Sequence, residues 1–134
     1  MREILFRGKC VDSGEWVYGV PIKKALVGSH DGYYPKIIPE CDGRHQTVYS
    51  TAIKEETLGQ YTGLKDKNGT KIFEFDICKA YIHIYKVGKK ELTGAICFEE
   101  GAFKFKCKRY IFNIYGLSAS IEVIGNVFDN SLEE

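Results

Sequence analysis

The chain has 134 residues, of which 44% are hydrophobic and 13% aromatic, with 19 Lys and Arg against 18 Asp and Glu. This length suits one domain with a single core, and the hydrophobic share excludes an intrinsically disordered chain. A net charge of +1 argues against a protein that neutralises many phosphates over its whole surface. No stretch approaches the roughly 18 uncharged apolar residues of a membrane span, so no membrane association is expected.

The first half of the chain contains short β-like runs separated by turn residues. Glu3–Arg7 and Glu15–Val20 flank a polar, glycine-containing turn and predict a hairpin. Residues 33–38 and 46–50 are further short strand candidates. Ala52–Thr57 is the best candidate for a helical turn, although six residues make a weak helix by themselves.

A second hairpin is predicted around Asn68-Gly69. Gln60–Thr62 and Lys71–Phe73 are strand-like, and they lie on either side of this dipeptide. Asn-Gly tolerates positive φ at both central positions of a type I′ turn, so we expect a tight turn here. Asn68 and Gly69 are therefore assigned a structural role.

Two carboxylates follow that hairpin. Glu74 and Asp76 are two residues apart, so on a strand both would face the same way, roughly 7 Å from each other. Paired carboxylates can perform acid-base chemistry, but at a turn Asp commonly accepts backbone N–H bonds, and we favour this structural role. His30, His45 and His83 are scattered and match no known nucleophile motif, so we predict no catalytic residue.

Residues 76–108 show the clearest alternation of apolar and polar side chains. They predict a meander of three strands, at 76–85, 91–98 and 102–108, with one apolar face and one wet face. A last strand is predicted at 121–124. The wet face carries four basic residues and two tyrosines that together form a candidate nucleic-acid contact: Lys104, Lys106, Lys108, Arg109, Tyr81 and Tyr85.

Lysines beside aromatic rings on an open sheet attract phosphates and stack on bases, as several single-strand binders do. The alternative is a solvated sheet face whose lysines prevent edge-to-edge aggregation, and we favour it. Residues 79–110 carry eight Lys and Arg against three Glu, a local charge of +5.

The cysteines and the N-terminus bear on the cellular compartment. The five cysteines contain no CxxC pair, which argues against a disulfide framework and against a structural zinc site: Cys10, Cys41, Cys78, Cys97 and Cys107. We expect them to be small buried hydrophobes in a reducing environment. The first six residues carry two charges and no long apolar run, so we expect no signal peptide and a cytoplasmic location.

Three parts of the sequence resemble the YopX family of phage and prophage proteins. They are Arg2–Arg7 followed by Trp16–Gly19, then Thr57–Gly69 continued by Ile72–Ile77, and finally Ile121–Asn130. The resemblance implies a small, β-rich, prophage-encoded protein of the bacterial host cell that assembles as a homo-oligomer. It implies no activity, because the motif residues are turn formers and strand fillers.

One position departs from the family pattern. The family usually has Glu-Gly-Asp where this chain has Glu74-Phe75-Asp76. If that Gly serves a turn with positive φ, Phe75 cannot easily replace it, and we expect the local backbone to differ.

The pattern as a whole predicts a mainly β protein (β-rich α+β). Short strands with regular turn signals suggest a small SH3-like barrel or a sandwich, with an added N-terminal β layer and one or two short helices. We expect one domain over residues 1–134, in which 1–52 would form the added layer and 53–134 the core.

For function, we predict an accessory protein that is not an enzyme and that binds a host or phage protein or assembles with itself. The alternative is a nucleic-acid-associated protein that uses the basic meander face. An enzyme whose site is brought together only by the fold is the third class. No cofactor and no metal is expected.

Overall fold

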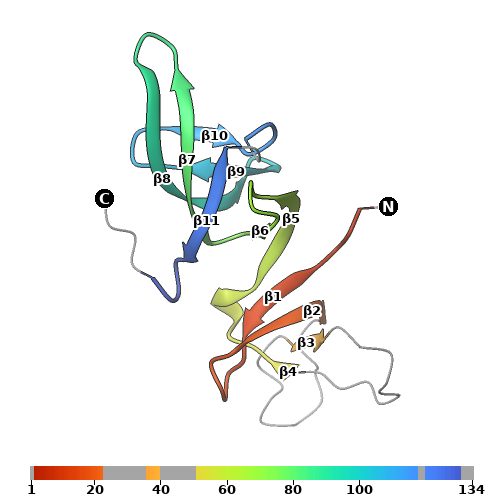
Figure 1. Ribbon diagram of the computed structural model, residues 1–134. Coiled ribbons are helices and arrows are strands. Elements are labelled where there is room, and N and C mark those ends of the chain that lie inside the picture. The colour runs from red at the N-terminus through yellow and green to blue at the C-terminus, as the bar shows by residue number, and fades with distance from the viewer. Residues whose placement is uncertain (1, 23–35, 40–50, 118–119, 131–134) are drawn as a thin grey trace. The chain divides into compact units, whose positions relative to one another are not determined.

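The computed structural model describes residues 2–22, 36–39, 51–117 and 120–130, which form two antiparallel sheets (Figure 1). The prediction of a mainly β fold is confirmed. The chain divides into two compact units, Met1–Tyr61 and Thr62–Glu134, and the expected layer over 1–52 with a core over 53–134 stays a prediction. The narrower assignment to an SH3-like barrel or a sandwich stays a prediction.

The first unit is built on an antiparallel sheet. Its strands are β1 (Phe6–Lys9), β2 (Trp16–Ile22), β3 (Lys36–Pro39) and β4 (Thr51–Ala52), and β5 (Gly59–Lys65) begins beside β1. The predicted N-terminal hairpin is confirmed as β1 and β2. The strand candidate at 46–50 lies outside the described residues, and the one at 33–38 is described only from residue 36, where β3 begins.

Close backbone packing explains one glycine of this sheet. Gly19 lies opposite Phe6 on one side and Pro39 on the other. A Cβ atom at Gly19 would collide with the carbonyl oxygen of Ile38. Only glycine therefore fits where β2 and β3 pair.

The predicted helical turn at 52–57 is mostly wrong. Ala52 ends β4, and Ile53 forms a bridge with Cys10, so only Glu55–Thr57 (η2) forms a 3-10 turn. The Lys54 N–H donates to the Lys9 carbonyl at 2.8 Å. Hydrogen bonds to β1 thus take the place of a weak local helix, and η2 is the helical segment in the part of the chain that the structure describes.

The second unit contains the rest of β5, β6 (Lys71–Phe73), and a five-stranded sheet in the order β10-β9-β8-β7-β11. The strands of this sheet are β7 (Asp76–Ile84), β8 (Gly88–Glu99), β9 (Ala102–Lys106), β10 (Ile111–Asn113) and β11 (Ile121–Asn126). The predicted three-strand meander is confirmed. Its third strand ends at Lys106, earlier than expected, because the chain turns into β10, with the Cys107 N–H donating to the Tyr110 carbonyl at 2.8 Å.

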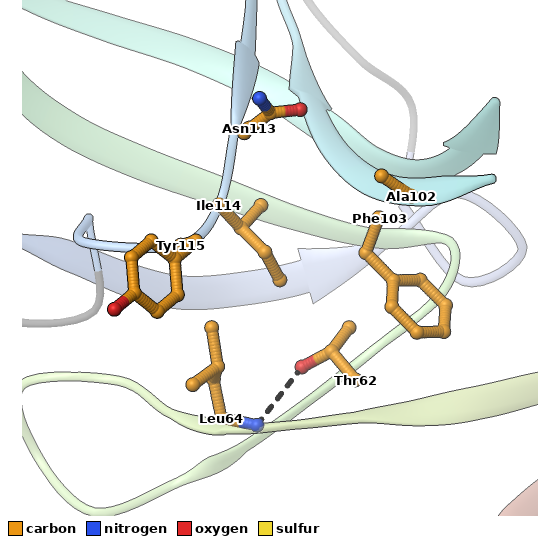
Figure 2. Close-up of a pocket in the computed structure, with 7 residues that line it drawn as sticks. All are labelled: Thr62, Leu64, Ala102, Phe103, Asn113, Ile114 and Tyr115. Atoms are coloured by element: carbon orange, nitrogen blue, oxygen red, sulfur yellow. Dashed lines mark hydrogen bonds between the residues drawn. The ribbon is translucent and has the colours of Figure 1, made fainter. Parts of the chain in front are cut away.

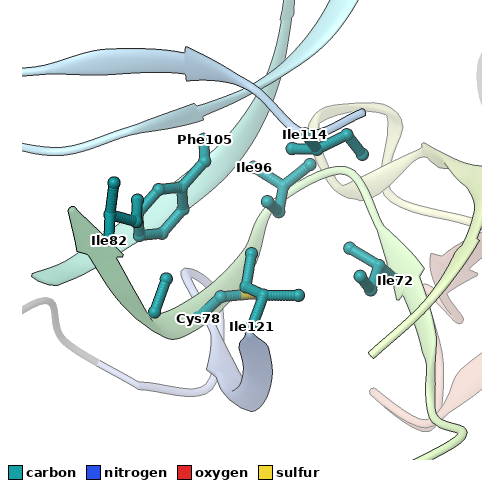
Figure 3. Packing of buried hydrophobic residues seen from close by; sticks show 8 residues of the cluster. Ile72, Cys78, Ile82, Ile96, Phe105, Ile114 and Ile121 are labelled. Carbon is teal, nitrogen blue, oxygen red and sulfur yellow. The ribbon is translucent and has the colours of Figure 1, made fainter. Parts of the chain in front are cut away.

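The alternation along this meander builds the core of the second unit. Figure 3 shows buried side chains from several strands packed against one another: Ile72, Cys78, Ile82, Ile96, Phe105, Ile114 and Ile121. On β7, Cys78, Ala80 and Ile82 are buried while Tyr81 and His83 are exposed, as the period of two requires.

The turn between β5 and β6 differs from the type I′ turn that we predicted. Gly69 has a φ of +83°, but Asn68 is not at positive φ. The Gly69 N–H donates to the Asp66 carbonyl at 3.0 Å, and the Asp66 N–H donates to the Thr70 carbonyl at 2.8 Å. The hairpin therefore closes with an ordinary β-turn followed by a left-handed glycine.

Candidate functional site

The structure pairs two of the predicted contact lysines with acids. The Lys104 ammonium lies 3.5 Å from a Glu100 carboxylate oxygen, and that of Lys106 lies 3.0 Å from one of Glu99. Lys104 is also largely covered, since only 16% of its side chain is exposed. Acidic neighbours therefore offset much of the charge that these two lysines would offer to a phosphate.

The six predicted contacts are not brought together. Tyr81 of β7 lies opposite Glu91 of β8, and Lys106 of β9 lies opposite Ala95 of β8. These positions are four residues apart, roughly 13 Å along the strand. Lys108 and Arg109 follow β9 in the turn before β10, and Tyr85 lies at the far end of the β7–β8 hairpin.

The two carboxylates of the predicted pair lie in different environments. Asp76 is buried, and its Oδ2 accepts a hydrogen bond from the Phe73 N–H at 2.7 Å, while Glu74 is half-buried in the turn. His83 is exposed on β7, and His30 and His45 lie outside the described residues. Among the residues that the structure describes, no three metal-ligating side chains form a cluster.

Burial of the cysteines is less complete than we expected. Cys78 is fully buried, whereas Cys10, Cys97 and Cys107 are half-buried, and all four are free thiols. Cys41 lies outside the described residues. Hydrogen bonds from Ser13 lower the pKa of the Cys10 thiol, while burial raises the pKa of Cys97 and of Cys107.

Asp66 is a structural residue that the sequence reasoning missed. Its carboxylate accepts N–H bonds from Asn68 at 2.8 Å, from Thr70 at 2.9 Å and, on β11, from Val123 at 2.9 Å. Burial by itself would raise the pKa of this carboxyl, but the three N–H bonds outweigh it and the pKa lies below the usual value. Asp in the first position of a β-turn was the available signal.

Phe75 adopts a backbone conformation that glycine favours, with a φ of +72°. The expected difference from the family backbone stays a prediction. The Phe75 N–H donates to the Ile96 carbonyl at 2.8 Å, and its own carbonyl accepts from the Val127 N–H at 2.9 Å. Its ring meets Phe128 edge-on, with centroids 5.2 Å apart. These contacts hold an aromatic residue in a strained turn.

An open apolar groove lies beside β10 in the second unit. Its volume is about 390 Å³, and three chain segments line it: Thr62 and Leu64, Ala102 and Phe103, and Asn113, Ile114 and Tyr115. Figure 2 shows Leu64, Ile114 and Phe103 facing a common space, with Tyr115 at its side. The Tyr115 side chain is 89% exposed, although it is large and mostly apolar.

The chemistry of the groove is that of an apolar contact surface. The hydroxyl of Thr62 donates to the Ile72 carbonyl at 2.8 Å and accepts from the Leu64 N–H at 3.2 Å. Its hydrogen-bonding groups are therefore already used within the protein. The aliphatic and aromatic side chains of Leu64, Phe103 and Ile114 make up most of the wall. Such a surface gains free energy when another apolar group covers it.

The two sheets, the glycine-dependent turns and the apolar groove define a small β-rich protein. The family model for YopX proteins matches residues 5–133, nearly the whole chain, and this protein belongs to the YopX family. A comparison with curated proteins finds no match. Among the described residues, none of the helical segments is long and apolar enough to cross a membrane.

Proposed function

We propose that this YopX-family protein is a non-enzymatic protein-binding module that associates with itself, and that copies meet at the groove beside β10. The observation that carries the proposal is an apolar groove open to solvent at the edge of a sheet. Tyr115, which lines the groove and is exposed, is of the residue type that is enriched in the buried centres of interfaces. The prophage origin and the cytoplasmic location stay predictions.

The position of β10 supports association between copies. β10 is the end strand of the five-stranded sheet, so in the part of the chain that is described its outer edge has no neighbouring strand in that sheet. The β9 hydrogen bonds at Cys107 and Ile114 imply that the N–H groups of Ile111 and Asn113 point to this outer side.

Two such edges can pair antiparallel about a two-fold axis. The same surface then serves both copies, which is the commonest symmetry of homo-oligomers. Ile111, which is 46% exposed, lies on the strand that would form the centre of this contact. Pairing would satisfy outward backbone groups and cover apolar surface in the same step.

Light scattering during size-exclusion chromatography tests the proposal at several micromolar concentrations. We expect the wild-type protein to be oligomeric, and Tyr115→Ser to weaken association at least about tenfold, because a tyrosine ring leaves the interface. Ile111→Lys should have a similar effect, since a charge on an edge strand opposes pairing.

Tyr85→Ser is the matched control. Tyr85 is 83% exposed and therefore as accessible as Tyr115, but it does not line the groove. We expect this variant to associate like the wild-type protein. A strictly monomeric wild-type protein, or equal losses in the two tyrosine variants, would contradict the proposal.

A further inference from the structure

The β7–β8 hairpin ends in a basic and aromatic tip. Residues 81–90 contain three lysines and two tyrosines but no Asp or Glu. The hairpin extends beyond the other strands of its sheet, which places this segment at the end of a narrow two-stranded projection (Figure 1). The tip is therefore a positively charged projection that is separate from the groove.

Ion pairs concentrate the remaining positive charge at this tip. Of the three glutamates in residues 79–110, Glu91 lies 2.8 Å from the ammonium of Lys79, and the other two pair with Lys104 and Lys106. Eight basic residues minus three acidic ones leave a charge of +5. Lys86, Lys89 and Lys90 lie outside these pairs, and all three are at the tip.

The turn at the tip holds its residues in an exposed and strained arrangement. The Val87 N–H donates to the Ile84 carbonyl at 3.0 Å, and Lys86 has a φ of +66°, a conformation that usually requires Gly or Asn. The Lys86 ammonium lies 5.6 Å from the centre of the Tyr85 ring. Backbone strain of this kind is common at functional sites, so we take the charge of Lys86 as functional.

The outer face of the hairpin suits a single strand of nucleic acid. Tyr81 is exposed on this face opposite Glu91, whose carboxylate pairs with Lys79, and Lys89 lies opposite His83 further along; Tyr85 is exposed in the turn that follows β7. Rings spaced along a basic track are what sequence-independent single-strand binders use.

We propose that the hairpin tip binds single-stranded nucleic acid. Lys86 and Lys89 contact phosphates, Lys90 adds positive charge from the opposite face of the hairpin, and Tyr85 stacks on a base. This moves the nucleic-acid contact from the predicted stripe at Lys104, Lys106 and Lys108 to the other end of the sheet. It concerns a surface outside the groove and does not depend on self-association.

Fluorescence anisotropy with a labelled oligothymidine tests the role of charge. Two neutralised phosphates predict binding about sevenfold weaker when salt rises from about 50 to about 200 mM. The triple variant Lys86→Gln, Lys89→Gln and Lys90→Gln should lose this salt-sensitive binding. The matched control, Lys104→Gln with Lys106→Gln, should keep it, because those two lysines are already paired with glutamates.

A second pair of variants tests stacking. Tyr85→Ala should bind about tenfold more weakly, whereas Tyr85→Phe keeps the ring and should bind like the wild-type protein. Unchanged thermal unfolding confirms that each variant is folded. The proposal is overturned if the wild-type protein does not bind at about 50 mM salt or if the control lysine variant loses as much affinity as the tip variant. Binding to vesicles of anionic phospholipid but not to the oligonucleotide would also overturn it.

Discussion

The strained turn at Phe75 offers a direct test of the backbone geometry. At an ordinary strand position, Ala is more stable than Gly by about 0.5–1 kcal/mol, because Gly loses more backbone entropy on folding. Phe75 has a φ of +72°, where a Cβ atom costs about 1–2 kcal/mol. Phe75→Ala keeps this strain, whereas Phe75→Gly releases it. We therefore expect the usual order to reverse, with the Gly variant more stable by about 1 kcal/mol.

The comparison isolates the backbone because both variants lose the same ring. Removing the edge-on contact with Phe128 costs about 0.5–1.5 kcal/mol in each case, so this loss cancels in the difference. The free energy of unfolding in urea measures the effect. The matched control compares Thr93→Ala with Thr93→Gly, since Thr93 is exposed on β8 opposite Lys79 and does not have a positive φ. There the Ala variant should be the more stable one. If Ala is the more stable residue at both positions, the strain argument is wrong.

The remaining predictions concern the turn carboxylate, a sheet contact and a thiol. Asp66→Asn should lower the free energy of unfolding, measured in urea, by about 1.5–3 kcal/mol. Because the folded-state pKa of Asp66 is lowered, this difference from wild type should be complete above about pH 4. It should shrink as pH falls through that pKa. Gly94→Ala should cost about 1–3 kcal/mol in the same assay, because its Cβ would collide with a β9 carbonyl, while Thr93→Ala stays within about 1 kcal/mol. Cys10 should react with iodoacetamide before the other described thiols, and Ser13→Ala should slow its reaction, since the Ser13 side-chain hydrogen bond, the largest cause of the lowered Cys10 pKa, is lost while the backbone bonds remain; equal rates would contradict this.

The strands of the second unit were largely predictable. Cys78, Ala80 and Ile82 alternate with polar residues, and a period of two is a local property that every residue of a strand shares. The turn after β5 was predicted in place but not in type. Its geometry depends on the Asp66 carboxylate, which also accepts a bond from Val123 far along the chain.

The candidate surfaces were less predictable. The groove joins segments at 62–64, 102–103 and 113–115, and no local pattern indicates that these three meet. The lysine stripe was visible as a composition, but the pairing of Lys106 with Glu99 and of Lys79 with Glu91 depends on how the strands align. The net charge of a sequence segment therefore differs from the unpaired charge that its folded surface presents to a binding partner.

The sequence by itself determined that this protein is mainly β, where most of its strands lie and to which family it belongs, because these depend on side-chain period and on local motifs. Tertiary structure alone decided that Phe75 takes a left-handed conformation, since hydrogen bonds to Ile96 and Val127 hold it there. It also decided which lysines are paired and where apolar side chains stay open to solvent. Both depend on contacts between residues that are distant in the chain.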